Sequence, residues 1–105
     1  MKLAIYGAQG YALAVYEAIT TLYPKREISC FLVTGMDGNA PVLGGIPVRE
    51  LSAYAQGLSV EEKRETEVLI ATPEQVQPDI EESLENYGFR HHRRLTFARH
   101  AELMK

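Results

Sequence analysis

The chain has 105 residues and a formal net charge of −3 at pH 7, and 46% of its residues are hydrophobic and 24% charged. This composition is that of an ordinary globular domain, and the length suffices for one hydrophobic core. The slight acidity gives no overall attraction to nucleic acid or to an anionic membrane. No apolar run approaches the roughly 20 residues of a membrane-spanning helix. We therefore expect a single domain over residues 1–105, with no nucleic-acid partner and no membrane span. The single cysteine allows no disulfide within the chain, so we expect a cytoplasmic location.

The first predicted elements are a short apolar strand over residues 2–6, a glycine turn and an amphipathic helix over 10–22. Glycine lets the backbone approach a ligand, and the free N–H groups of a first helical turn attract negative charge. The turn has the spacing G-x-x-G, at Gly7 and Gly10, rather than G-x-G-x-x-G. It therefore predicts a nucleotide-like ligand without identifying it. The alternative is that Gly7 only permits a tight turn.

A second apolar run over 28–33 predicts another buried strand. Its Cys30 is the single cysteine of the chain, and we predict a small core residue there rather than a reactive thiol. A glycine-rich loop over 35–41 follows, and residues 43–48 predict a turn and one very short strand. Residues 49–56 have the apolar spacing of a helix.

Local signals mark the starts of the next two helices. Ser59 and Glu62 have the spacing of a capping box, which predicts one or two helical turns. A buried strand over 67–71 then leads into Thr72 and Pro73. We predict Thr72 as the N-cap and Pro73 as the first residue of the following helix.

The last elements are predicted to be an edge strand over 89–95 and a short terminal helix over 96–104, with Gly88 ending the preceding helix. Arg90 to Arg94 form the basic cluster of the chain, and alternate residues of a strand share one face. We interpret the cluster as an exposed edge strand that its charges keep soluble. The alternative is a stripe that holds a phosphate or an acidic partner domain.

Alternating strands and helices predict an α/β fold with three layers, a Rossmann-like half with a parallel sheet of four to five strands. We expect the strand order 3-2-1-4-5. Its switch point lies between the first and fourth strands. The turn over 7–12 and the turn over 72–75 should therefore meet at one crevice, where both could offer N–H donors to the same ligand.

The candidate ligand-binding residues around this crevice are Gly7, Gln9, Gly10, Tyr11, Ala12, Asp37, Thr72 and Pro73. Gln9 and Tyr11 would donate hydrogen bonds beside the ligand, and the alternative for both is a solvated loop side chain. Asp37 would accept hydrogen bonds from a ribose or a base, and its alternative is turn chemistry. The sequence shows no nucleophile–base–orienter set and no metal-ligand spacing. We therefore expect neither catalysis by this chain alone nor a metal site.

The motifs GAQGYA, CFLV, VLGGIPV, VLIATP and YGF follow one another in this order. The pattern resembles the N-terminal domain of bacterial sugar O- and N-acyltransferases of the PglD and NeuD type, over roughly the first 90 residues. In that family the first turn commonly reads G-x-G-G-[HY]-[AG], and a segment "lGipVlG" follows the second strand. The residues that match the first motif are Gly7, Gly10, Tyr11 and Ala12, with Gln9 in place of one glycine. The residues that match the second, around one inserted glycine, are Leu43, Gly44, Ile46, Pro47 and Val48.

The resemblance implies a Rossmann-like domain that binds a UDP-sugar at the glycine turn. The backbone N–H groups of residues 9–12 would hold the diphosphate, and Thr72 would lie on the opposite wall. The family often carries an acidic pair for the uridine where this chain has Thr34 and Gly35, so that Asp37 would have to substitute. Catalysis and acetyl-CoA binding belong largely to a following left-handed β-helix, and similar domains also precede glycosyltransferase domains. We therefore expect a nucleotide-sugar-binding module of a larger protein, serving a C-terminal catalytic domain in bacterial surface-polysaccharide synthesis.

Two other classes of function stay open. One is an NAD(P)- or CoA-binding domain, although the second strand ends at Val33 and Thr34 without the acidic residue that holds a ribose in NAD-binding domains. The other is an interaction domain that has lost its ligand. Such a domain would form a homo-oligomer or dock a catalytic neighbour, through the cluster Arg90 to Arg94.

Overall fold

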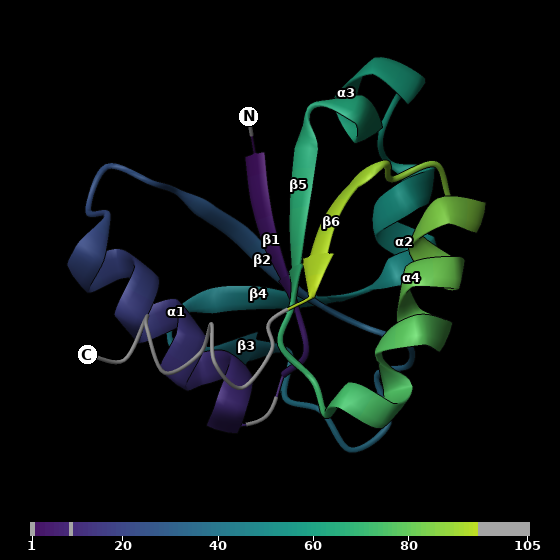
Figure 1. Ribbon diagram of the computed structural model, residues 1–105. Coiled ribbons are helices and arrows are strands. Elements are labelled where there is room, and N and C mark those ends of the chain that lie inside the picture. The colour runs from purple at the N-terminus through teal and green to yellow at the C-terminus, as the bar shows by residue number, and fades with distance from the viewer. Residues whose placement is uncertain (1, 9, 95–105) are drawn as a thin grey trace.

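The computed structural model describes residues 2–8 and 10–94, and Figure 1 shows a central sheet with helices on both sides. The strands are β1 Lys2–Tyr6, β2 Ile28–Val33, β3 Val42–Leu43, β4 Ile46–Glu50, β5 Thr66–Ile70 and β6 His91–Arg94. The helices are α1 Gly10–Leu22, α2 Leu51–Gln56, α3 Val60–Arg64 and α4 Gln77–Asn86, and a 3-10 turn, η1 Glu74–Val76, precedes α4. Helix α1 covers one face of the sheet, and α2 and α4 cover the other. Gln9 and the helix predicted over 96–104 lie outside the described residues.

The sheet has six strands in the order β3-β4-β2-β1-β5-β6. Strands β4, β2, β1, β5 and β6 run parallel, and β3 runs antiparallel to β4. The α/β class and a mostly parallel sheet are therefore confirmed. The predicted order 3-2-1-4-5 of an all-parallel sheet with four to five strands is wrong, because the sheet is mixed and has an additional edge strand.

The additional strand arises from the turn between β3 and β4. Gly44 and Gly45 have φ angles of +59° and +83°, which suit a two-residue hairpin turn of type I′. The chain therefore folds back on itself, and Val42 and Leu43 pair with Pro47 and Ile46. The sequence predicted only a turn and one short strand here, because a pairing segment of two residues carries no periodic signal.

Most local predictions about helices agree with the structure. Helix α1 has the predicted bounds and ends before Pro24. The capping box of α3 is formed: the Ser59 hydroxyl accepts from the Glu62 backbone N–H at 3.1 Å, and the Glu62 carboxylate accepts from the Ser59 backbone N–H at 3.0 Å. Helix α2 begins later than predicted, at Leu51, because Arg49 and Glu50 still pair with β2.

The start of α4 differs from the prediction. Thr72 is not an N-cap, since the turn η1 intervenes and its N-cap position, Pro73, makes no side-chain hydrogen bond. The helix itself starts at Gln77 with Pro78 in its first turn. Proline is favoured at the first position of a helix. Pro73 and Pro78, five residues apart, therefore both fit the start of a helix. The buried Gln77 amide closes the loop by donating to the Thr72 carbonyl oxygen at 3.0 Å.

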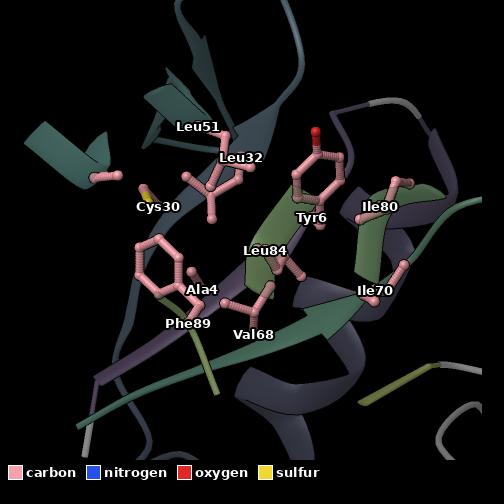
Figure 2. Close-up of a cluster of buried hydrophobic side chains, with 11 residues drawn as sticks. Ala4, Tyr6, Cys30, Leu32, Leu51, Val68, Ile70, Ile80, Leu84 and Phe89 are labelled. Atoms are coloured by element: carbon pink, nitrogen blue, oxygen red, sulfur yellow. The ribbon is translucent and has the colours of Figure 1, made fainter. Parts of the chain in front are cut away.

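Each face of the sheet carries its own hydrophobic cluster. On the α1 face, Ile5 and Phe31 pack with Val15 and other buried residues. On the opposite face, residues of β1, β2 and β5 pack with α2, α4 and Phe89 (Figure 2). Strands β1 and β2 are buried on both faces, which explains their nearly continuous apolar sequences. Cys30 is fully buried in the second cluster, as predicted, and burial raises the pKa of its thiol to about 11.

Candidate functional site

The connections at the carboxyl ends of β1 and β5 leave the sheet on opposite sides. Strand β1 lies between β2 and β5 and continues into α1, which covers one face of the sheet. Strand β5 continues into α4, which covers the other face. Neighbouring strands whose connections diverge in this way form a topological switch point, where open α/β sheets commonly bind ligands. In Figure 1, α1 and α4 lie on either side of this point.

A cleft of about 470 Å³ lies at this switch point, on the side of α4. It is formed by the ends of β1 and β2, the loops that follow β2 and β5, and one face of η1 and α4. The residues that line it are Tyr6, Gly7, Val33, Thr34, Gly35, Asn39, Thr72, Val76, Asp79, Ile80 and Ser83. Its volume lies within the range of about 300–1,000 Å³ that is typical of small-molecule sites.

Gly7 and Thr72 both line this cleft, so the two predicted turns meet there. Gly7 has a φ of +128°, and a Cβ at this position would lie 2.8 Å from the carbonyl oxygen of Ala71. Its N–H donates to the Leu32 carbonyl at 2.7 Å. Glycine is therefore required here by the backbone itself, which is the structural alternative considered for Gly7. The same close approach brings the β1 and β5 loops together.

Hydroxyl groups lie at the floor of the cleft. The hydroxyls of Tyr6 and Thr34 are 2.5 Å apart, across the ends of β1 and β2. The ring of Tyr6 lies in the hydrophobic cluster, with its hydroxyl pointing out of it (Figure 2). Burial is the main cause that raises the pKa of Tyr6, so the hydroxyl stays protonated at neutral pH. The Thr72 hydroxyl is buried and has no hydrogen-bond partner among the described residues.

The wall contributed by α4 carries the charge of the cleft. Asp79 and Ser83, one helical turn apart, line it together with the apolar Val76 and Ile80. Among the described residues, no lysine, arginine or histidine lines this cleft. Asp79 is not among the residues predicted from the sequence, because one carboxylate on a helix rich in acidic residues does not differ by pattern from a solvated side chain. Its place in the first turn of a helix that starts at the crevice was the available signal.

The loop after β2 presents a different residue from the one predicted. Asp37 is exposed at the tip of this loop and does not line the cleft, whereas Asn39 does. The Asn39 amide donates to the Gly35 carbonyl and its backbone N–H donates to the Met36 carbonyl, each at 3.0 Å. These two bonds turn the loop back toward the sheet.

The remaining predicted site residues lie beside the cleft rather than in its lining. Ala12 is fully buried in the α1-face cluster, and its Cβ would be 3.3 Å from a Cβ at Gly7. Tyr11 packs against the same cluster, and burial followed by the nearby charge of Glu74 raises the pKa of its hydroxyl. Gly10 is exposed, and a Cβ there would have no atom within 4 Å.

Pro73 is exposed and precedes η1, outside the lining. Gln9 cannot be placed, as it lies outside the described residues. Of the predicted site residues, the structure therefore brings together Gly7 and Thr72 at the cleft.

The basic cluster forms ion pairs within the chain. Arg94 donates to Glu81 of α4 at 2.6 Å, and His92 lies 2.9 Å from a Glu85 oxygen on the same helix. On the opposite face, Arg93 lies 3.4 Å from the Glu67 carboxylate, which also accepts from Arg26 at 2.8 Å. The predicted alternation of the two faces is confirmed.

Within residues 2–8 and 10–94, no group of three or more His, Cys, Asp and Glu side chains is arranged to hold a metal ion. The same part of the chain contains no helix of the length and apolarity needed to cross a membrane. Comparison with known proteins found no matching family model, no matching curated protein and no matching solved structure.

Proposed function

We propose that this domain is a binding module that holds a nucleotide-sugar, or a related phosphorylated ligand, in the cleft between the β1 and β5 loops. The observation that carries the proposal is the 470 Å³ cleft at the topological switch point, lined by Gly7 and Thr72. A ligand hydroxyl or phosphate oxygen near Thr72 would give its buried hydroxyl the partner that it lacks among the described residues.

The proposal assigns the phosphates to the start of α1. This helix begins at Gly10, three residues after Gly7, and its thirteen residues form a helix dipole whose positive end attracts anions. The open space around Gly10 leaves the backbone of the first turn accessible to a ligand. The sugar or nucleoside part would then lie in the cleft.

We propose binding rather than catalysis by this chain alone. The Tyr6 and Thr34 hydroxyls bond to each other, and among the described cleft residues no carboxylate, histidine or lysine is hydrogen-bonded to a hydroxyl that it could activate. The chemistry would belong to a partner catalytic domain, an acyltransferase or a glycosyltransferase of surface-polysaccharide synthesis.

Neither alternative function is favoured by a specific observation. The chain has Thr34 after β2, where an NAD-binding domain would carry an acidic residue toward the ribose. The hypothesis of an interaction domain depends on the cluster from Arg90 to Arg94, which would bind the partner. Arg93 and Arg94 pair with carboxylates of β5 and α4, which weighs against a stripe reserved for a partner.

Thermal unfolding and calorimetry with UDP-N-acetylglucosamine, UDP, NAD, NADP and CoA test the proposal. A ligand at about 100 times its Kd adds about 2.7 kcal/mol to the free energy of unfolding, which is a readily measured rise in Tm. We expect UDP-N-acetylglucosamine and UDP to raise Tm, and NMR spectra to change at residues of the cleft. No heat and no rise in Tm with any of these ligands at millimolar concentration would overturn the proposal.

A further inference from the structure

Two carboxylates of helix α4, those of Asp79 and Glu82, have no hydrogen bond or ion pair with a described residue, and of these two only Asp79 lines the cleft. Glu81 and Glu85 pair with Arg94 and His92 of β6. A carboxylate accepts hydrogen bonds at both oxygens and has no donor of its own. Asp79 is therefore suited to a ligand group that offers two adjacent donors.

The other residues that line the cleft limit which chemical groups of a ligand could bind beside Asp79. Val33, Val76 and Ile80 supply apolar surface for the face of a ring. Hydroxyls of Thr34 and Ser83 add polar groups that both donate and accept. A neutral ring with hydroxyls along one edge, either a ribose or a pyranose, complements this combination.

The negative charge of Asp79 makes the α4 side of the cleft unfavourable for the phosphates of a ligand. Asp79 supplies a negative charge, and the described lining residues include no cation to offset it. Asp79 is exposed, so water screens its charge in part, but like charges in direct contact still repel. A phosphate directly beside its carboxylate would therefore be unfavourable. Asp79 would thus orient the ligand, with its diol toward α4 and its phosphates toward α1.

We infer that Asp79 is the specificity-determining residue of the cleft, accepting hydrogen bonds from the vicinal diol of a ribose or pyranose ring. This inference rests on the proposed function, because it assigns a role within the same cleft. A purely structural role also exists for Asp79, since an acidic residue in a first helical turn favours the helix dipole. The test therefore needs a measurement that does not change when only the stability of the helix changes.

The variant Asp79→Asn keeps the shape of the side chain and removes its charge. Glu82→Gln is the matched control, because Glu82 is an exposed residue of the same helix that does not line the cleft. Calorimetry with uridine, 2′-deoxyuridine, UDP, UDP-N-acetylglucosamine and inorganic pyrophosphate separates the parts of the ligand. Tm of each variant without ligand monitors the helix.

We expect Asp79→Asn to weaken binding of UDP-N-acetylglucosamine at least about 10-fold, as is typical when a hydrogen bond to a charged group is lost. Glu82→Gln should bind it as the unchanged protein does, and pyrophosphate should bind no more weakly to Asp79→Asn. If the diol is that of the ribose, removal of the 2′-hydroxyl should weaken binding to the unchanged protein and have no effect in Asp79→Asn. If it is that of the pyranose, the unchanged protein should bind UDP-N-acetylglucosamine more tightly than UDP, and Asp79→Asn should bind the two with equal affinity.

The outcomes distinguish this inference from the proposed function. Equal binding of UDP-N-acetylglucosamine to the unchanged protein and to Asp79→Asn would overturn the role of Asp79 and leave the binding module standing. Weaker binding of pyrophosphate to Asp79→Asn would also overturn it, because the carboxylate would then not repel phosphate. No binding of any probe to the unchanged protein would overturn both.

Discussion

The hydroxyl of Tyr6 and the hydroxyl of Thr34 lie 2.5 Å apart and connect the carboxyl ends of β1 and β2 at the floor of the cleft. Tyr6 is almost fully buried, whereas Thr34 is exposed. The bond therefore joins a core side chain to the loop that carries Asn39. Stability and ligand binding should both respond when it is removed.

Tyr6→Phe should lower the free energy of unfolding by about 0.5–1.5 kcal/mol, the usual net contribution of one hydrogen bond. The ring stays packed in its cluster, and the exposed Thr34 hydroxyl can bond to water instead. Urea denaturation measures the change. Thr34→Val, which removes the other hydroxyl, should cost a similar amount, and the double variant should cost less than the sum. Fully additive costs would show that the two hydroxyls do not stabilise each other.

Gly7→Ala should destabilise the fold strongly. A non-glycine residue at a φ of +128° carries about 1–3 kcal/mol of backbone strain. The added Cβ would also lie 2.8 Å from the backbone oxygen of Ala71, which cannot move without disturbing β5. Urea denaturation should show a loss of at least about 1 kcal/mol. A variant as stable as the unchanged protein would contradict this geometry.

Gly10→Ala tests the phosphate assignment without disturbing the fold. A Cβ at Gly10 meets no atom within 4 Å, and alanine is the better helix former, so stability should be unchanged or rise by up to about 1 kcal/mol. Binding of UDP-N-acetylglucosamine should weaken, because the methyl group would stand where the diphosphate approaches the backbone. Calorimetry measures the affinity and urea denaturation the stability.

Gly57→Ala is the control for this experiment, since Gly57 ends α2 and does not line the cleft. A Cβ there makes only ordinary contact, at 3.7 Å from the Tyr54 carbonyl oxygen. Equal affinities in the two alanine variants would place the diphosphate away from the start of α1.

Acid should weaken the packing of β6 against α4. The hydrogen bond from Arg94, followed by the charges of Arg94 and His92, lowers the pKa of Glu81 below its usual value of 4.5. A depressed pKa means that the stabilisation is present above the unfolded-state pKa and is lost as the pH falls through the folded-state pKa. The free energy of unfolding should therefore decrease below about pH 4.5.

Glu81→Gln should flatten this decrease, measured by urea denaturation between about pH 3 and pH 6. Glu82→Gln is the matched control on the same helix and should retain the slope of the unchanged protein. The same slope in Glu81→Gln would show that other carboxylates dominate the acid response.

The parts of the fold that the sequence predicted correctly depend on signals a few residues long. The capping box at Ser59 acts through neighbouring residues, and the structure forms it as expected. The start of α4 was misplaced because Pro73 and Pro78 satisfy the same local preference. Gln77 distinguishes the two positions in the folded protein, because its buried side chain donates to the Thr72 carbonyl oxygen and holds the residues between them outside the helix.

The cleft was predicted less completely than the fold, because its lining depends on segments distant in the sequence. The meeting of the Gly7 and Thr72 loops follows from the adjacency of β1 and β5, which is the part of the predicted strand order that the structure retains. Asp79 enters the lining only because α4 packs on the same face as the end of β2. Asn39 replaces Asp37 because the β2 loop folds back on itself, and no periodic pattern reports such a turn.

The two margins of the sheet bear on how the folded protein behaves at high concentration. On one side, β3 offers only two residues of backbone to an incoming chain, and a tight hairpin holds them. On the other, β6 is a row of histidines and arginines. Short or heavily charged outer strands are poor templates for stacking copies of a protein into fibrils. The native state should accordingly resist growth into cross-β assemblies from either side.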